Sequence, residues 1–135
     1  MDGHSKLTER LLFEPAIYNV DITTDRTSDY RSALGYDQFV AHLVTATELA
    51  SGEVATVQFM QATDSSGTGA KVLGSATTYT APVAGGAADI TAQIYQDQLD
   101  TANDFDHIAV KVTSDKSGAV VGYANLILGD PSYSL

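Results

Sequence analysis

The segment spanning residues 53–76 constrains the fold of this 135-residue chain more than any other. In its first half, Ala55, Val57 and Phe59 alternate with Thr56 and Gln58, the period-two pattern of a strand with one face on a core. The run D-S-S-G then breaks the pattern, and a second short strand follows. This strand–turn–strand unit predicts antiparallel β-structure.

Short segments of the same kind follow one another along the chain. Strands are predicted over residues 18–22, 38–47, 54–61, 72–79, 90–95, 107–112 and 119–128. The pair Ser51-Gly52 and the run 115–118 are predicted to close hairpins, and one helical turn within 96–104 is expected to point Leu99 inward. The predicted fold is therefore all-β, an antiparallel β-sandwich or jelly-roll-like barrel with an extended N-terminal arm.

The arm is predicted from the first fifteen residues. They carry mixed charge and an isolated apolar cluster, and they end at Pro15, which cannot donate to a central ladder. We therefore expect an N-terminal arm over residues 1–15 and a single β-sandwich domain over residues 16–135. A second interpretation stays open, in which the cluster belongs to a first strand that begins earlier and packs on its own core.

Composition limits the classes of function. The chain has 17 acidic and 7 basic residues, for a net charge of -10, which repels phosphate backbones and anionic lipid. We therefore expect no nucleic-acid partner and no membrane surface. The chain has no cysteine, which excludes disulfides, thiolate nucleophiles and cysteine-bound zinc.

The titratable side chains do not form a catalytic pattern. His4, His42 and His107 are scattered, and His42 sits in an apolar strand, where a hydrogen-bonded core or interface histidine is expected. Asp104 and Asp106 would share one face of a strand and His107 the other, which favours a solvated strand entry over a metal site. We predict no catalytic residue, no cofactor and no metal, and a small hydrolase is disfavoured.

The unit V-Q-F-M-Q-A-T-D-S-S-G-T-G-A-K-V-L-G-S-A resembles a pattern in small structural proteins encoded in the head gene region of tailed bacteriophages. The matching later parts are H-I-A-V-K-V at 107–112, a small-residue hairpin and strand at 118–128, and G-D-P-S-Y at 129–133. The resemblance covers residues 16–135. It implies a capsid decoration (cement) protein that binds the outside of the head, with the major capsid protein as its partner.

The resemblance also implies a non-enzymatic homo-oligomer, with a trimer favoured, located on the capsid surface of the virion after synthesis in the host cytoplasm. An arm that orders on a partner would extend the contact. The expected apolar anchors of that contact are Leu11, Leu12, Phe13 and Tyr18.

A second hypothesis from another class is a carbohydrate-binding β-sandwich module of a tail or fibre. Such a module would carry a concave strip of exposed tyrosines flanked by Asp or Asn. The seven tyrosines are spread over most of the chain, and core or interface packing is the simpler interpretation of them.

Overall fold

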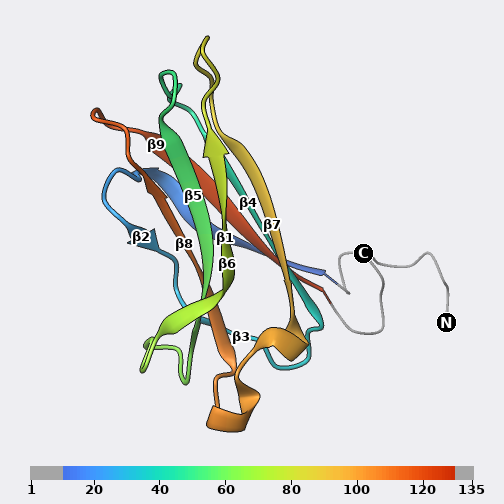
Figure 1. The fold of residues 1–135 in the computed structure, drawn as a ribbon. Helices are drawn as coiled ribbons and strands as arrows, with labels where there is room; N and C mark the ends of the chain where they lie inside the picture. The colour runs from blue at the N-terminus through green and yellow to red at the C-terminus, as the bar shows by residue number, and fades with distance from the viewer. Residues whose placement is uncertain (1–10, 130–135) are drawn as a thin grey trace, which may run out of the picture.

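The chain folds into two antiparallel sheets packed face to face (Figure 1). The structure is a computed structural model and describes residues 11–129. The first sheet has the order β1-β9-β4-β7 and the second β2-β8-β5-β6, with β3 also paired to β8. The strands are β1 (Leu11–Asp21), β2 (Arg26–Thr27), β3 (Arg31–Ser32), β4 (Gln38–Thr45), β5 (Val54–Ala62), β6 (Lys71–Thr80), β7 (Asp89–Tyr95), β8 (His107–Ser114) and β9 (Val121–Gly129). This strand order is that of a jelly roll, which confirms the predicted fold class.

The core lies between the sheets and takes alternate residues from each long strand. In β4, every second side chain from Phe39 to Thr45 is buried, and β5, β7 and β8 show the same period. Phe39 and Leu43 from the first sheet and Val110 from the second are fully buried. One hydrophobic layer therefore holds the two sheets together.

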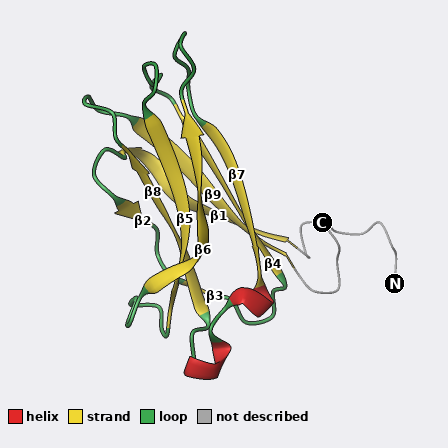
Figure 2. Cartoon of the chain, viewed as in Figure 1, coloured by secondary structure: helices red, strands yellow, loops and turns green. Residues whose placement is uncertain are grey.

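Two 3-10 turns follow β7, η1 (Gln96–Gln98) and η2 (Thr101–Asn103). Figure 2 shows both at one end of the sandwich. Leu99 lies between them and is 5% exposed, so the predicted inward-pointing leucine is confirmed. Within residues 11–129, no helix is long and apolar enough to span a membrane.

Two predicted hairpins are wrong. Ser51-Gly52 does form a turn, but β4 and β5 belong to different sheets, and so do β8 and β9 on either side of the 115–118 loop. These connections cross from one sheet to the other. Turn residues determine where the chain reverses, whereas burial of both inner faces determines which strands pair. Of the consecutive named strands, β5 and β6 are the two that pair.

The first strand begins earlier than the predicted domain boundary at residue 15. Leu11 pairs with Gly129, and β1 continues through Pro15 along β9. Pro15 is tolerated because β1 is an edge strand of its sheet. At an edge, a proline, which lacks an N–H group, does not remove a hydrogen bond from the middle of the sheet. Residues 11–15 therefore belong to the sheet, as in the second interpretation, and residues 1–10 of the predicted arm lie outside the described residues.

The pairing of β1 with β9 is irregular in two places. The register shifts between Pro15 and Ile17 and again between Ile17 and Val20, and Asn19 has a φ of 51°. Each shift inserts a residue that has no partner and changes which side chains face the core. As a result Ile17 is buried, whereas Tyr18 is exposed.

Candidate partner-binding surface

The first sheet carries apolar and aromatic side chains on the side that faces away from the second sheet. We call this side the outer face. The large apolar and aromatic members of the outer face are Phe13 and Tyr18 of β1, Tyr123 and Ile127 of β9, Val40 and Val44 of β4, and Tyr95 of β7.

Strand register places most of these side chains in two rows that cross the sheet. Ile127 pairs with Phe13 on one side and with Val40 on the other, so the three lie next to one another across three strands. Tyr123 pairs with Val44 in the same way. Directly opposed residues in antiparallel strands point to the same side and contact each other. A polar row, in which Asn125 faces His42, lies between these two rows, and Tyr95 faces Gln38. The outer face therefore carries two apolar rows with polar side chains between them.

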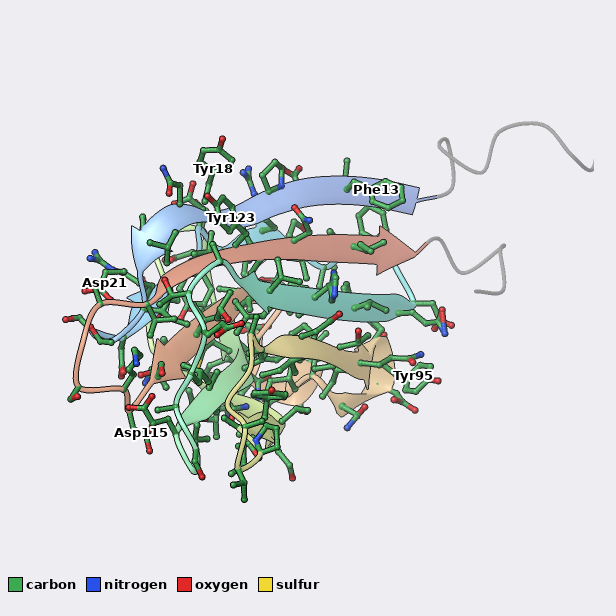
Figure 3. All side chains as sticks on the ribbon, turned by 90° about the horizontal axis from the view of Figure 1, so that it is seen from above. Phe13, Tyr18, Asp21, Tyr95, Asp115 and Tyr123 are labelled. Atoms are coloured by element: carbon green, nitrogen blue, oxygen red, sulfur yellow. The ribbon has the colours of Figure 1, made fainter. Side chains whose placement is uncertain are left out.

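Two tyrosines form its most prominent feature. The rings of Tyr18 and Tyr123 have centroids 5.4 Å apart at an interplanar angle of 85°, an edge-to-face pair. The Tyr123 hydroxyl is 3.2 Å from Oδ1 of Asn19. Figure 3 shows both rings on the β1 and β9 side, with Phe13 and Tyr95 toward the other end of the sheet. Tyr18 is 74% and Phe13 55% exposed.

Charge is nearly absent from this surface. Among residues 11–129, three carboxylates lie within strands, and all others lie in loops or in the 3-10 turns. Glu14 is opposite the core residue Leu126. Asp21 ends β1 opposite Val121, at the margin of the outer face, and its Oδ1 accepts the N–H groups of Thr23 and Val120. This leaves Asp89 as the carboxylate within the outer face. Its Oδ1 is 2.6 Å from Nε2 of His42. Depletion of charge is typical of the centre of a protein interface.

The exposed side of the second sheet has a different character. Met60 and Val72 are its accessible apolar members near one end, and Val72 is 59% exposed. The rest is dominated by hydroxyl, amide and ammonium groups: Thr56, Gln58, Thr78, Lys111 and Thr113. The strongly exposed aromatic side chains, Phe13, Tyr18 and Tyr95, thus all lie on the first sheet.

The structure separates the four predicted anchors. Phe13 and Tyr18 both lie on the outer face. Leu12 is 38% exposed but pairs with the core residue Leu128, so it points to the opposite side of β1. The backbone of Leu11 pairs with Gly129, and its side chain lies outside what the structure describes. A role of these residues in partner binding stays a prediction.

Sequence reasoning missed the members of the outer face contributed by β9 and β7. Tyr123, Ile127 and Tyr95 are far from residue 13 in the sequence, and only the sheet order brings them together. One signal was present: the 38–47 run is apolar at both parities, which predicted a strand covered on both sides or at a subunit contact. In β4 the alternate parity is half-buried, including Val40 and Val44.

The histidines and the acidic cluster form no metal centre in the described part of the chain. Within residues 11–129, no group of three or more His, Cys, Asp and Glu side chains could hold a metal ion. Nδ1 of His107 is 2.7 Å from Oδ1 of Asp106, and Asp104 ends η2 in a left-handed conformation. His42 is hydrogen-bonded as expected, but it lies on the outer face rather than in the core.

A wide hollow of about 370 Å³ opens at the loop end of the sandwich. Its charged lining residues are Glu48 and Lys116, beside Leu49 and Val83. Nζ of Lys116 donates to Oε1 of Glu53 at 3.1 Å, so the ammonium group is already paired. Ser51 also lines the hollow, and among the described residues no side chain is hydrogen-bonded to its hydroxyl as an activating base would be.

Hydrogen bonds at two turns stabilise carboxylates in their charged form. Oδ1 of Asp21 accepts from the N–H and hydroxyl of Thr23, at 3.0 and 2.7 Å, and from the N–H of Val120 at 3.1 Å. These donors hold the pKa of Asp21 below its ordinary value. The hydroxyl and N–H of Thr68 likewise lower the pKa of Asp64. Asp21 thereby connects the end of β1 to the start of β9.

We expect acid to destabilise the protein through these groups. A folded-state pKa below the unfolded value means that the unfolded chain binds more protons, so stability rises with pH. The contribution is complete above the unfolded pKa, near 4, and is lost as the pH falls through the folded value. Thermal unfolding at about pH 6 and about pH 3 should show this loss, and Asp21→Asn should make it smaller. An equal loss in that variant would contradict the role of Asp21.

Comparison with known proteins identifies the fold. No protein-family model and no curated protein matches the sequence. Among solved structures, a chain in the structure of the infectious bursal disease virus Gx strain is similar, with a TM-score of 0.54 and 10% identity over 93% of this chain and 33% of that chain. A chain of the VP2 subviral particle of the same virus has a TM-score of 0.53 and 13% identity, over 88% of this chain and 32% of the other. The chain thus spans about a third of the length of these viral chains, and the likeness is one of fold.

Proposed function

We propose that this chain is a structural virion protein, and specifically a capsid decoration or cement protein of a tailed phage. It binds the outer capsid surface, where its partner is the major capsid protein, and it stabilises the contacts between capsomers. It is made in the host cytoplasm, acts as a homo-oligomer without cofactor or catalysis, and then resides on the virion. The resemblance of residues 16–135 to decoration proteins favours a trimer.

One observation carries this proposal: the outer face is aromatic and nearly uncharged on a chain with a net charge of -10. A protein that works by contact needs a stiff body and a desolvated patch with aromatic anchors, and it needs no active site. Phe13 and Tyr18 supply such anchors on a sheet fixed by a buried core. The jelly-roll fold that the chain shares with chains of virus particles supports the same role.

Cosedimentation with virus particles assembled without this protein tests the proposal. We expect the wild-type chain to sediment with the particles. The double variant Phe13→Ser/Tyr18→Ser should bind at least about tenfold more weakly, because each aromatic anchor commonly contributes more than 1 kcal/mol. Both positions are exposed, so thermal unfolding should change little.

Val83→Ser is the matched control, since it also removes an exposed apolar side chain but lies in the loop between β6 and β7. It should bind like the wild type. Failure of the wild-type chain to bind any head or tail particle would overturn the proposed function. Equal binding by the wild type and the double variant would overturn the assignment of the outer face.

The alternative is a carbohydrate-binding module of a tail or fibre. The structure does bring Tyr18, Tyr123 and Asn19 together. However, the two rings are nearly perpendicular, so they do not form the flat platform on which a sugar ring stacks. Binding to a glycan array that Tyr18→Ala abolishes, without any binding to particles, would favour this alternative.

A further inference from the structure

One border of the outer face is a free strand edge. The first sheet ends at β7, which pairs with β4 on one side, and no strand within residues 11–129 pairs with its other side. β7 has the sequence D-I-T-A-Q-I-Y, in which Asp89 is the single charged residue. Such an edge presents backbone donors and acceptors to another strand.

The hydrogen-bond pattern identifies which backbone groups are presented. The N–H of Gln96 donates to the carbonyl of Asp37 at 2.8 Å, and the N–H of Thr45 donates to the carbonyl of Ala88 at 3.0 Å. Between these two bonds the ladder of β4 and β7 has no register shift. Directly opposed residues therefore alternate between pairs that exchange two backbone hydrogen bonds and pairs that exchange none.

Even-numbered residues of β7, such as Ala92, therefore direct their backbone groups toward β4. Thr91 and Gln93 direct theirs to the free edge. The N–H of Tyr95 also points that way, but it donates to Oε1 of Gln98 at 3.0 Å. The open part of the edge is thus centred on residues 91–93.

The other edges carry features that discourage pairing. β1 contains Pro15 and two register shifts, and β2 has two residues. β6 begins with Lys71 and is interrupted where its register with β5 shifts, near Gly74, which has a φ of 72°. Proline, lysine, bulges and shortness are the usual means by which an edge strand avoids association. β7 has none of them, so it differs from its counterparts in the same molecule.

We propose that β7 pairs antiparallel with β7 of a second copy of this chain, which joins two first sheets into one eight-stranded sheet. An identical edge is its own complement about a two-fold axis. With the axis at Ala92, Thr91 faces Gln93 of the other copy, so the open backbone groups of each copy bond to those of the other. Ile90 then faces Ile94 of the other copy on the core side.

Charge is compatible with a second copy at this edge. Two chains of net charge -10 repel each other, and β7 brings a single carboxylate to the contact. In the register centred on Ala92, the two Asp89 side chains lie at opposite ends of the paired strands. Asp89 is also hydrogen-bonded to His42 of its own chain.

This inference goes beyond the proposed function, and it gives a dimer in place of the trimer that the resemblance favours. Pairing of two strand edges buries less surface than the roughly 1,000 Å² typical of stable interfaces, so the dimer should be weak in solution. The dimer would present two outer faces side by side on one sheet. Binding to a repeating surface would then be strengthened by bivalency.

Sedimentation velocity and native mass spectrometry over a wide range of concentration test the inference without any particle. The wild-type chain should populate a dimer as its concentration rises. Gln93→Pro removes an outward N–H group and no bond to β4, and it should weaken the dimer at least about tenfold. Gln93→Lys, which places a charge at the edge, should do the same if the proline variant fails to fold.

Thr78→Pro is the matched control on the neighbouring edge. The N–H of Ala81 donates to the carbonyl of Glu53 at 2.9 Å, and Thr78 pairs with Thr56, so the N–H of Thr78 also points outward from β6. This variant should dimerise like the wild type. A monomer at every concentration, a trimer, or a dimer insensitive to both Gln93 variants would overturn the inference. So would an equal loss of the dimer in Thr78→Pro or in the Phe13→Ser/Tyr18→Ser variant.

Discussion

Replacing Phe39 by alanine should lower the free energy of unfolding by about 3–5 kcal/mol. Phe39 is fully buried on β4, an inner strand of the first sheet, where it is flanked by Ile94 and Leu128 on the adjacent strands. Truncation removes most of a large side chain and leaves a cavity that sheet residues on both sides cannot fill. Because domains of this size are stable by about 5–15 kcal/mol, the variant should lie close to unfolding. Urea denaturation followed by circular dichroism measures the change.

Val83→Ala provides the control for this measurement. Val83 is 93% exposed in a loop, so its truncation should change the free energy of unfolding by no more than about 0.5 kcal/mol. A loss below about 1 kcal/mol in Phe39→Ala would mean that this position is not part of a close-packed core.

The second large effect is expected at Gly85, in the loop between β6 and β7. Gly85 has a φ of +76°, and an added Cβ would lie 2.8 Å from the carbonyl oxygen of Leu49. That carbonyl accepts the N–H of Gly86 at 2.9 Å, so it cannot move without breaking the bridge between two loops. Gly85→Ala should therefore cost about 1–2 kcal/mol for the backbone conformation and a further 1–3 kcal/mol or so for the clash.

Gly52→Ala separates these two causes. Gly52 has nearly the same φ, +79°, but no atom lies within 4 Å of an added Cβ. It should show the conformational cost of about 1–2 kcal/mol alone. Chemical denaturation of both variants gives the difference, and equal losses would contradict a steric role for the Leu49 carbonyl.

The strands were predictable where burial follows a strict period of two. Ala55, Val57 and Phe59 alternate in the sequence and are all buried in β5. β4, β5, β7, β8 and β9 fall close to their predicted ranges for this reason, whereas β6 buries Leu73 alone and shows no such period. Leu99 was predictable because it is the large apolar residue in a mostly polar turn.

Other features of the fold depend on contacts between distant residues. β2 and β3 are short and polar, and they form strands because β8 lies beside them: the N–H of Ser28 donates to the carbonyl of Val110 at 2.9 Å. The shifts in β1 and the crossing of β4–β5 between sheets likewise depend on β9 and on the opposite sheet. The sequence around each of these segments does not indicate which distant strand it pairs with.

The residues of the outer face were likewise predictable only in part. The apolar cluster near the N-terminus predicted Phe13 and Tyr18 as contact residues. The local sequence could not distinguish them from Leu12, which lies on the other side of the same strand. Tyr123 joined the site because β9 lies next to β1. A surface assembled from four strands can be recognised only after the strand order is known.

The pairing of Leu11 with Gly129 places the first and last described residues on neighbouring strands at one corner of the sandwich. A polypeptide joined directly at residue 11 or at residue 129 would therefore leave the domain at that same corner. The domain could be inserted into a host polypeptide as a single module on two adjacent tethers. It could equally be circularly permuted, with new ends opened in the 115–118 loop and the old ones joined by a short linker.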